Sequence, residues 1–131
     1  MNPNAACRQS ARGFTLIEVM VALTIFAFCA VSMVQVLTQA VDNFSKIERK
    51  TFGTWIAENK LSELRLQPEF PSIGEKEVDL EYSNREWLVK TKVIKTELAT
   101  MRRVEVEVYL REPNIKEPVF VAGLSGFVGE S

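Results

Sequence analysis

The sequence predicts an α+β fold: one long N-terminal α-helix, membrane-spanning in its first half, packed on a small antiparallel β-sheet. Two observations predict it. The chain carries no charged residue from Val19 to Val41 and no proline between Pro3 and Pro68. After Pro68, apolar and polar residues alternate with a period of two, which is typical of strands with one buried face.

The apolar segment follows a short basic leader. Arg8 and Arg12 precede Gly13, and Glu18 is the one charged residue between Gly13 and Val41. The uncharged stretch after Glu18 is long enough to span ~30 Å of hydrocarbon as a helix. A carboxylate inside such a segment is costly, so we expect Glu18 to be functional and to need a partner.

Two other interpretations of this N-terminus are an ordinary secretory signal and a plain single-pass anchor. A secretory signal has a shorter apolar stretch that ends in a small-x-small cleavage site, and no such site follows the apolar segment here. A plain anchor explains the apolar segment and the positive charges of Arg8 and Arg12 on the cytoplasmic side. It does not explain why Glu18 is tolerated.

The composition of the 131-residue chain argues against most chemistry. Lys and Arg number 16 against 17 Asp and Glu, with no basic block, so nucleic-acid binding has no electrostatic support. The chain contains no His, which excludes a Ser-His-Asp arrangement and a His-ligated zinc. Its two cysteines, Cys7 and Cys29, lie in the leader and the apolar segment. We therefore expect no metal, no cofactor and no enzyme activity; a tethered periplasmic hydrolase is the weaker alternative.

The helix is expected to run from Phe14 to about Leu66. At 1.5 Å per residue such a helix is ~80 Å long. Gln67 should end it, because the residue before a proline disfavours helical backbone. Gly53 costs roughly 1 kcal/mol against alanine inside a helix, and the alternatives for it are close packing, a bend, or simple tolerance.

The second half of this helix has more apolar surface than one sheet needs. A single sheet requires a stripe a little over 100° wide, and two apolar arcs together cover much more. We expect burial on two sides, by the chain's own sheet and by another subunit, with Phe52, Trp55 and Ile56 as the partner contacts; the alternative is a sheet that wraps further. The arcs consist of Phe44, Ile47, Phe52, Trp55 and Ile56, and of Ala57, Leu61 and Leu64.

Four strands are expected after the helix. The first is half-buried through Val78, Leu80 and Tyr82, and Ser83-Asn84 forms the turn into the second. The fourth is a short strand, residues 119–122, before a glycine-containing tail. Apolar residues of the second and third strands are Trp87, Val89 and Val93, and Val104, Val106, Val108 and Leu110.

Opposite charges are expected to face each other if the second and third strands pair. Lys90 and Lys92 would then lie opposite Glu105 and Glu107. Each such cross-strand pair contributes a few tenths of a kcal/mol. Acidic residues that alternate with valines are interpreted as a solvated face of the sheet.

The sequence RGFTLIEV at residues 12–19 resembles the cleavage and assembly signal of type IV pilins and of type II secretion pseudopilins. This resemblance implies that a prepilin peptidase cuts between Gly13 and Phe14 and N-methylates Phe14. It also implies that Glu18 acts in filament assembly by meeting the methylated amine of Phe14 of a neighbouring subunit. A buried ion pair of this kind suits setting register better than adding stability.

A second resemblance covers the part of the chain beyond the membrane segment. Residues 55–66 follow the pattern W-x-A-x-N-x-L-x-E-L-R-L, which is similar to the I subunit of type II secretion systems, a minor pseudopilin. Residues 85–87, 102–106 and 124–127 are similar to the same family.

The family resemblance implies a division of the chain into four segments. Residues 1–13 are a leader that is removed, 14–41 a transmembrane and assembly helix, 42–66 a periplasmic amphipathic helix, and 67–131 the antiparallel sheet domain. The mature chain then carries 14 of the 16 basic side chains, since Arg8 and Arg12 leave with the leader.

The resemblance also implies a role and a location. The chain is expected in the inner membrane as a single-pass protein with a periplasmic C-terminal domain, before assembly into the periplasmic pseudopilus. Expected partners are the J and K minor pseudopilins, the major pseudopilin, prepilin peptidase and membrane lipid. Together with J and K it would form the pseudopilus tip, promoting filament assembly and export of folded proteins across the outer membrane. The alternative is a minor pilin of a type IV or competence pilus.

Overall fold

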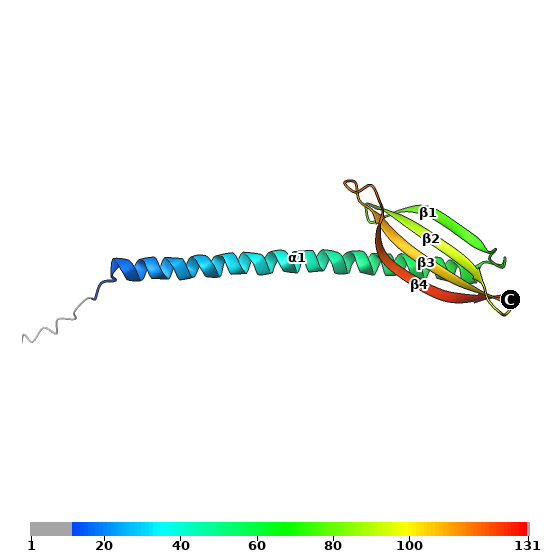
Figure 1. Ribbon diagram of the computed structural model, residues 1–131, viewed down its shortest axis with the longest axis horizontal. Helices are drawn as coiled ribbons and strands as arrows, with labels where there is room; N and C mark the ends of the chain where they lie inside the picture. Colours follow the sequence, from blue (N-terminus) through cyan, green and yellow to red (C-terminus); the bar gives the residue numbers. More distant parts are fainter. Residues whose placement is uncertain (1–11, 131) are drawn as a thin grey trace, which may run out of the picture. The chain divides into compact units, whose positions relative to one another are not determined.

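The computed structural model describes residues 12–130, which form one helix and a four-stranded sheet (Figure 1). By its contacts the chain divides into two compact units, Met1–Asp42 and Asn43–Ser131. The elements in chain order are α1 (Leu16–Leu66), β1 (Gly74–Tyr82), β2 (Arg85–Lys95), β3 (Met101–Arg111) and β4 (Val119–Gly129).

In the first unit, α1 is apolar and exposed along its length. The helix is long and apolar enough to cross a membrane, judged by length and composition. Three of its hydroxyl groups are satisfied within the helix: those of Thr24, Ser32 and Thr38 donate to the carbonyl oxygen one turn earlier, at 2.8 to 3.0 Å. Internal satisfaction of polar groups is what a hydrocarbon environment requires.

The two ends of α1 follow from capping and from proline. The helix begins at Leu16, two residues later than the expected Phe14, because Thr15 takes the N-cap position. It ends at Leu66, as predicted, and the amide of Gln67 makes the final bond to the carbonyl of Glu63 at 3.1 Å.

In the second unit, the sheet is an antiparallel meander in the order β1-β2-β3-β4, and the C-terminal part of α1 runs across one of its faces (Figure 1). This confirms the predicted fold class. β3 supplies the centre of the core, because Val104, Val106 and Val108 are completely buried. Trp87 of β2 is also fully buried, and its indole N–H donates to the Tyr82 carbonyl at 3.1 Å.

The predicted half-burial of β1 is confirmed at Tyr82, which packs against the core, and is wrong at Val78 and Leu80. Val78 is 48% exposed and Leu80 is 40% exposed, although both share a sheet face with the buried Val89 and Trp87 of β2. The core residues of α1 pack against β2, β3 and β4, so β1 lies beyond the helix at the edge of the sheet. Strand periodicity does not reveal which strands a helix covers.

The prediction for β4 was too short. The strand continues from Val119 to Gly129 and stays in register with β3 as far as Met101, with a bulge between Val108 and Tyr109. Ladder hydrogen bonds use the backbone alone, so glycines remain compatible with this strand. A side chain at Gly126 would also meet Leu61 of α1, since an added Cβ would lie 2.7 Å from Leu61 Cδ2.

The outer face of the sheet carries charge ladders. Lys90 and Lys92 lie opposite Glu107 and Glu105 in the β2–β3 register, as predicted. Their amines nevertheless bond to β1 carboxylates: Lys90 Nζ lies 3.0 Å from a Glu77 oxygen, and Lys92 Nζ 3.2 Å from a Glu75 oxygen. These groups are solvent-exposed, so the pairs contribute little to stability.

One outward-facing residue departs from the expected alternation. Leu88 lies on the outer face of β2 with Lys90 and Lys92, yet it is only 5% exposed. Its β3 neighbour in the register is Tyr109, whose ring packs edge-to-face on Phe120 with centroids 5.6 Å apart. Cross-strand aromatic neighbours therefore provide apolar packing around this position on the outer face.

Gly53 is a point of close approach between α1 and β4. The residue is buried, and an added Cβ would lie 2.7 Å from Val121 Cγ1 and 3.3 Å from Ala122 Cβ. Val121 occupies the β4 bulge and is held stiffly at χ1 as a β-branched residue. Of the alternatives for Gly53, the structure supports close packing.

We expect Gly53→Ala to lower the free energy of unfolding by about 1–2 kcal/mol. The clash with Val121 outweighs the roughly 1 kcal/mol gain in helix propensity. Chemical denaturation of the protein in detergent micelles, followed by tryptophan fluorescence, measures this difference. In a Val121→Ala background the same substitution should become neutral or stabilising. Equal losses in both backgrounds would show that contact with Val121 is not the cause.

Candidate functional site

The predicted cleavage bond lies in an exposed, non-helical segment ahead of α1. Phe14 is 88% exposed, and no heavy atom lies within 4 Å of a Cβ built on Gly13. Residues 12–15 are outside regular secondary structure, whereas the helix starts at the next residue. A protease needs accessible backbone outside regular secondary structure, and the Gly13–Phe14 bond lies in such a segment. The leader residues before Arg12, including Arg8, lie outside the described part of the chain.

Glu18 has a partner within its own segment, which the sequence-based expectation missed. Its carboxylate oxygen accepts a hydrogen bond from the Thr15 amide at 3.2 Å, and the Thr15 hydroxyl accepts one from the Glu18 amide at 3.3 Å. This reciprocal pair is a capping box, and the T-x-x-E spacing before an apolar run was the signal for it. The carboxylate also lies at the positive end of the helix dipole. These contacts lower the cost of the charge without neutralising it.

The three predicted partner contacts differ in exposure. Ile56 is only 4% exposed and belongs to the core, so it has almost no surface to offer a partner. Phe52 is partly buried against that core and packs edge-to-face on Tyr82 at 5.5 Å. Trp55 is 47% exposed, with its ring tilted over Tyr82 at 5.0 Å. Of the three, Trp55 presents the most surface.

Trp55 continues an exposed apolar stripe on the same helix. Phe44 is 69% exposed and Ile47 65% exposed, and a shallow hollow on the helix surface is lined by Ile47, Thr51 and Trp55 among others. Positions three and four apart share one helix face. We call Phe44, Ile47, Thr51 and Trp55 the helix stripe.

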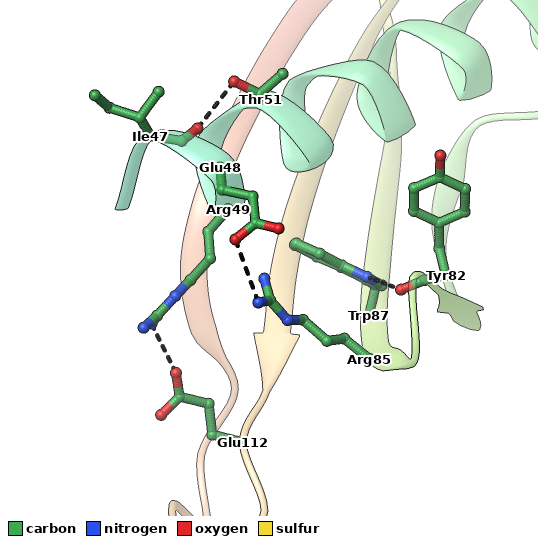
Figure 2. Close-up of polar contacts among 8 residues, drawn as sticks. All are labelled: Ile47, Glu48, Arg49, Thr51, Tyr82, Arg85, Trp87 and Glu112. Carbon is green, nitrogen blue, oxygen red and sulfur yellow. Dashed lines mark hydrogen bonds and ion pairs between the residues drawn. The ribbon is translucent and has the colours of Figure 1, made fainter. Parts of the chain in front are cut away.

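Ion pairs hold two loops of the sheet against the helix beside this stripe (Figure 2). Arg49 Nη1 lies 2.8 Å from a Glu112 oxygen after β3, and Glu48 lies 3.5 Å from Arg85 Nη2 at the start of β2. The β1–β2 turn reaches this position through Ser83 and Asn84, whose positive φ values of 53° and 59° give a tight hairpin. The two ion pairs link this helix face to the sheet, one after the end of β3 and one at the start of β2.

The ionisable groups with perturbed pKa values are not suited to proton transfer near neutral pH. A hydrogen bond and the negative charge of Glu77 raise the pKa of Lys90. A hydrogen bond from the Tyr109 hydroxyl to Glu107, at 2.7 Å, raises the pKa of Tyr109. Both pKa values move further from neutrality, whereas an efficient acid or base titrates near the working pH. Within residues 12–130, no group of three or more His, Cys, Asp or Glu side chains is arranged to hold a metal ion.

Comparison with known families gives two matches along the chain. Residues 8–34 match the prokaryotic N-terminal methylation motif, which contains Gly13, Phe14 and Glu18. Residues 47–129 match the family described as type II secretion system protein I. The second match covers the helix stripe from Ile47 onward and all four strands.

Individual relatives agree with the family match. The chain is 43% identical over 125 residues to the type II secretion system protein I of Pseudomonas aeruginosa, covering 92% of this chain and 97% of that one. It is 35% identical over 96 residues to the Klebsiella pneumoniae protein of the same name, covering 73% and 79%. The Vibrio cholerae protein is 32% identical over 100 residues, covering 76% and 84%. The chain belongs to the type II secretion system protein I family of minor pseudopilins.

Proposed function

We propose that this chain is a structural subunit of the pseudopilus tip, where it joins the J and K minor pseudopilins rather than catalysing a reaction. The helix stripe carries this proposal, because it leaves large apolar side chains exposed on a face that the chain's own sheet does not cover. Contiguous exposed apolar surface of this kind marks protein–protein contacts. The family match supplies the class of partner.

The proposed assembly begins in the inner membrane. Prepilin peptidase removes the leader at the exposed Gly13–Phe14 bond and N-methylates Phe14. The apolar half of α1 keeps the single-pass subunit in the membrane, with residues 43–131 in the periplasm, until it is extracted into the filament. Apolar helix segments then bundle with those of the major pseudopilin.

Glu18 is proposed to fix the axial position of each subunit in this bundle. Its carboxylate meets the methylated amine of Phe14 on a neighbour, while the capping bonds to Thr15 hold the side chain at the helix terminus. A charge pair in an apolar bundle is strongly dependent on geometry. Only one stagger of adjacent helices brings the two groups together, so the pair selects that stagger.

Co-purification with J and K tests the proposal directly. The full-length chain, expressed with both partners and extracted in mild detergent, should elute with them as one complex. Failure to recover J or K with the folded chain would contradict tip assembly. Loss of secretion in a deletion strain, restored by this chain, would then place the complex in the export machine.

We expect Trp55→Glu to weaken recovery of the J partner roughly tenfold or more while leaving the fold intact. Trp55 is half-exposed, and large aromatic side chains dominate interface energetics. Ile56→Glu is the matched control: it buries a charge in the core and should destabilise the domain by several kcal/mol. Circular dichroism with pull-down separates the two effects. Normal binding by folded Trp55→Glu would remove Trp55 from the interface.

A further inference from the structure

The sheet is wider than the helix that covers it. Four strands about 4.8 Å apart are ~19 Å wide, whereas a helix with its side chains is ~10 Å in diameter. Helix α1 packs on β2, β3 and β4 and reaches β1 at Tyr82, whereas Val78 and Leu80 on the same face of β1 stay open. The uncovered strip is β1 alone, about 5 Å wide, so a second helix there would lie over β1 and extend past the edge of the sheet.

The open strip is apolar and continuous with a groove beside the helix. Val78 is 48% exposed and Leu80 is 40% exposed on this face, and Ile73 in the preceding connector is 56% exposed. The groove has a volume of about 340 Å³ and lies between the flank of α1 and the inner face of β1. We call it the β1 groove; its lining includes Lys60, Leu64, Phe70, Ile73, Lys76 and Val78.

Charged side chains of both signs line this groove: Glu69 and Glu75 stand beside Lys60 and Lys76, and Glu75 is paired with Lys92. Lys76 belongs to the inner face, because its register partner Thr91 is only 7% exposed. Lys90 and Lys92 of the outer face pair with carboxylates, whereas Lys76 has no ion-pair partner among residues 12–130. An apolar floor beside an unpaired ammonium group is complementary to an apolar helix face flanked by a carboxylate.

We propose that the β1 groove binds the amphipathic helix of another pilin-like subunit, with a carboxylate of that helix beside Lys76. The bound helix lies next to α1 and completes a two-layer packing in which two helices cover four strands. The inference rests on the proposed function for the identity of the partner. It adds a second surface, different from the helix stripe, that binds a different neighbour.

Two unlike surfaces on one subunit have a consequence for assembly. The helix stripe offers a helix, and the β1 groove accepts one. Contacts between unlike surfaces are heterologous, and they propagate as open helical assemblies unless the rotation closes a ring. A subunit with both surfaces can therefore have a neighbour on each side.

Site-specific photo-crosslinking in cells that contain the whole secretion system tests the groove. The full-length chain carries p-benzoylphenylalanine at Val78, or at Phe127 as the control. Phe127 is matched in exposure, at 55%, and lies opposite Arg103 on the outer face. We expect the Val78 probe to give an adduct whose crosslinked peptide maps to the helix of another pilin-like subunit. The Phe127 probe should give no adduct with that helix.

A charge reversal adds a second measurement. Lys76→Glu should reduce the Val78 adduct at least fivefold without changing the circular dichroism spectrum, while Lys116→Glu, in the exposed loop after β3, should leave it unchanged. An unchanged adduct in Lys76→Glu would overturn the acid-flanked helix as occupant. A Val78 adduct with lipid, with a second copy of this chain, or with a sheet peptide would overturn the groove assignment, as would no adduct.

The outcomes also separate this inference from the proposed function. Co-purification with J and K is measured in the same cells. It tests tip assembly without depending on the crosslinker at Val78. Normal co-purification without a helix adduct contradicts the groove and leaves the tip proposal standing. A helix adduct from a pilin-like subunit other than J or K, without co-purification, supports the groove and contradicts the tip.

Discussion

A chain with arginine at position 13 should accumulate in membranes as the uncleaved precursor. We attribute this expected effect to the peptidase, because nothing in this chain's own fold requires glycine at position 13. A Cβ at Gly13 meets no atom within 4 Å, and Gly13 is not among the glycines with positive φ. Glycine is therefore not required by the local backbone. The requirement comes from the peptidase pocket, where a desolvated guanidinium costs several kcal/mol, or roughly a hundredfold or more in cleavage rate.

Mass spectrometry of the membrane-extracted chain measures this result. The unsubstituted chain should begin at N-methylated Phe14, and Gly13→Arg should retain the leader. Gly13→Ala is the matched control and should be cleaved to a large extent, because alanine remains small and uncharged. Recovery of the full-length precursor alone from unsubstituted cells with an active prepilin peptidase would refute the processing assignment.

The fold was predictable where a local pattern and the tertiary contacts agree. The end of α1 follows from Gln67-Pro68, and the buried face of β3 follows from alternation at Val104, Val106 and Val108. The exposure of Val78 was not predictable, because the same alternation occurs in a strand that the helix does not cover. One helix covers only part of a four-stranded sheet. The apolar–polar alternation within a strand does not reveal whether the helix covers that strand.

The sequence also did not reveal which of the predicted contact residues face the sheet and which face solvent. Trp55 and Ile56 are neighbours in sequence, yet successive helix positions are rotated by about 100°. When Ile56 points into the sheet, Trp55 must point along the flank, so the two cannot serve one partner face. The predicted apolar arc that contains both Trp55 and Ile56 is too broad to be a single contact surface. Deciding between them required the position of the sheet.

Glu18 illustrates a signal that was present in the sequence and overlooked. The T-x-x-E spacing predicts a capping box, and the structure contains it between Thr15 and Glu18. This gives Glu18 two separable contributions, a hydrogen bond that caps its own helix and a charge available to a neighbour. Substitutions that remove one contribution at a time distinguish them.

Glu18→Gln and Glu18→Ala should both leave cleavage and membrane insertion intact while strongly reducing incorporation into the pseudopilus and secretion. Glutamine preserves the capping box but removes the charge, whereas alanine removes both. If the charge meets the amine of Phe14 on a neighbour, either change leaves that amine buried without a counter-ion. Breaking a buried pair in this way costs about 3–5 kcal/mol, enough to reduce assembly more than a hundredfold.

Thr15→Ala is the matched control, because it weakens the cap and keeps the carboxylate. Loss of an N-cap costs about 1 kcal/mol, so this variant should secrete nearly as well as the unsubstituted chain. Secreted cargo is measured against cell-retained cargo at native expression, together with N-methylation of Phe14 by mass spectrometry. Normal secretion by Glu18→Gln with failure of Glu18→Ala would assign the residue to helix capping. Normal secretion by both Glu18 variants would show that Glu18 does not set the axial position of the subunit. The amine of Phe14 on the neighbour would then need no carboxylate partner.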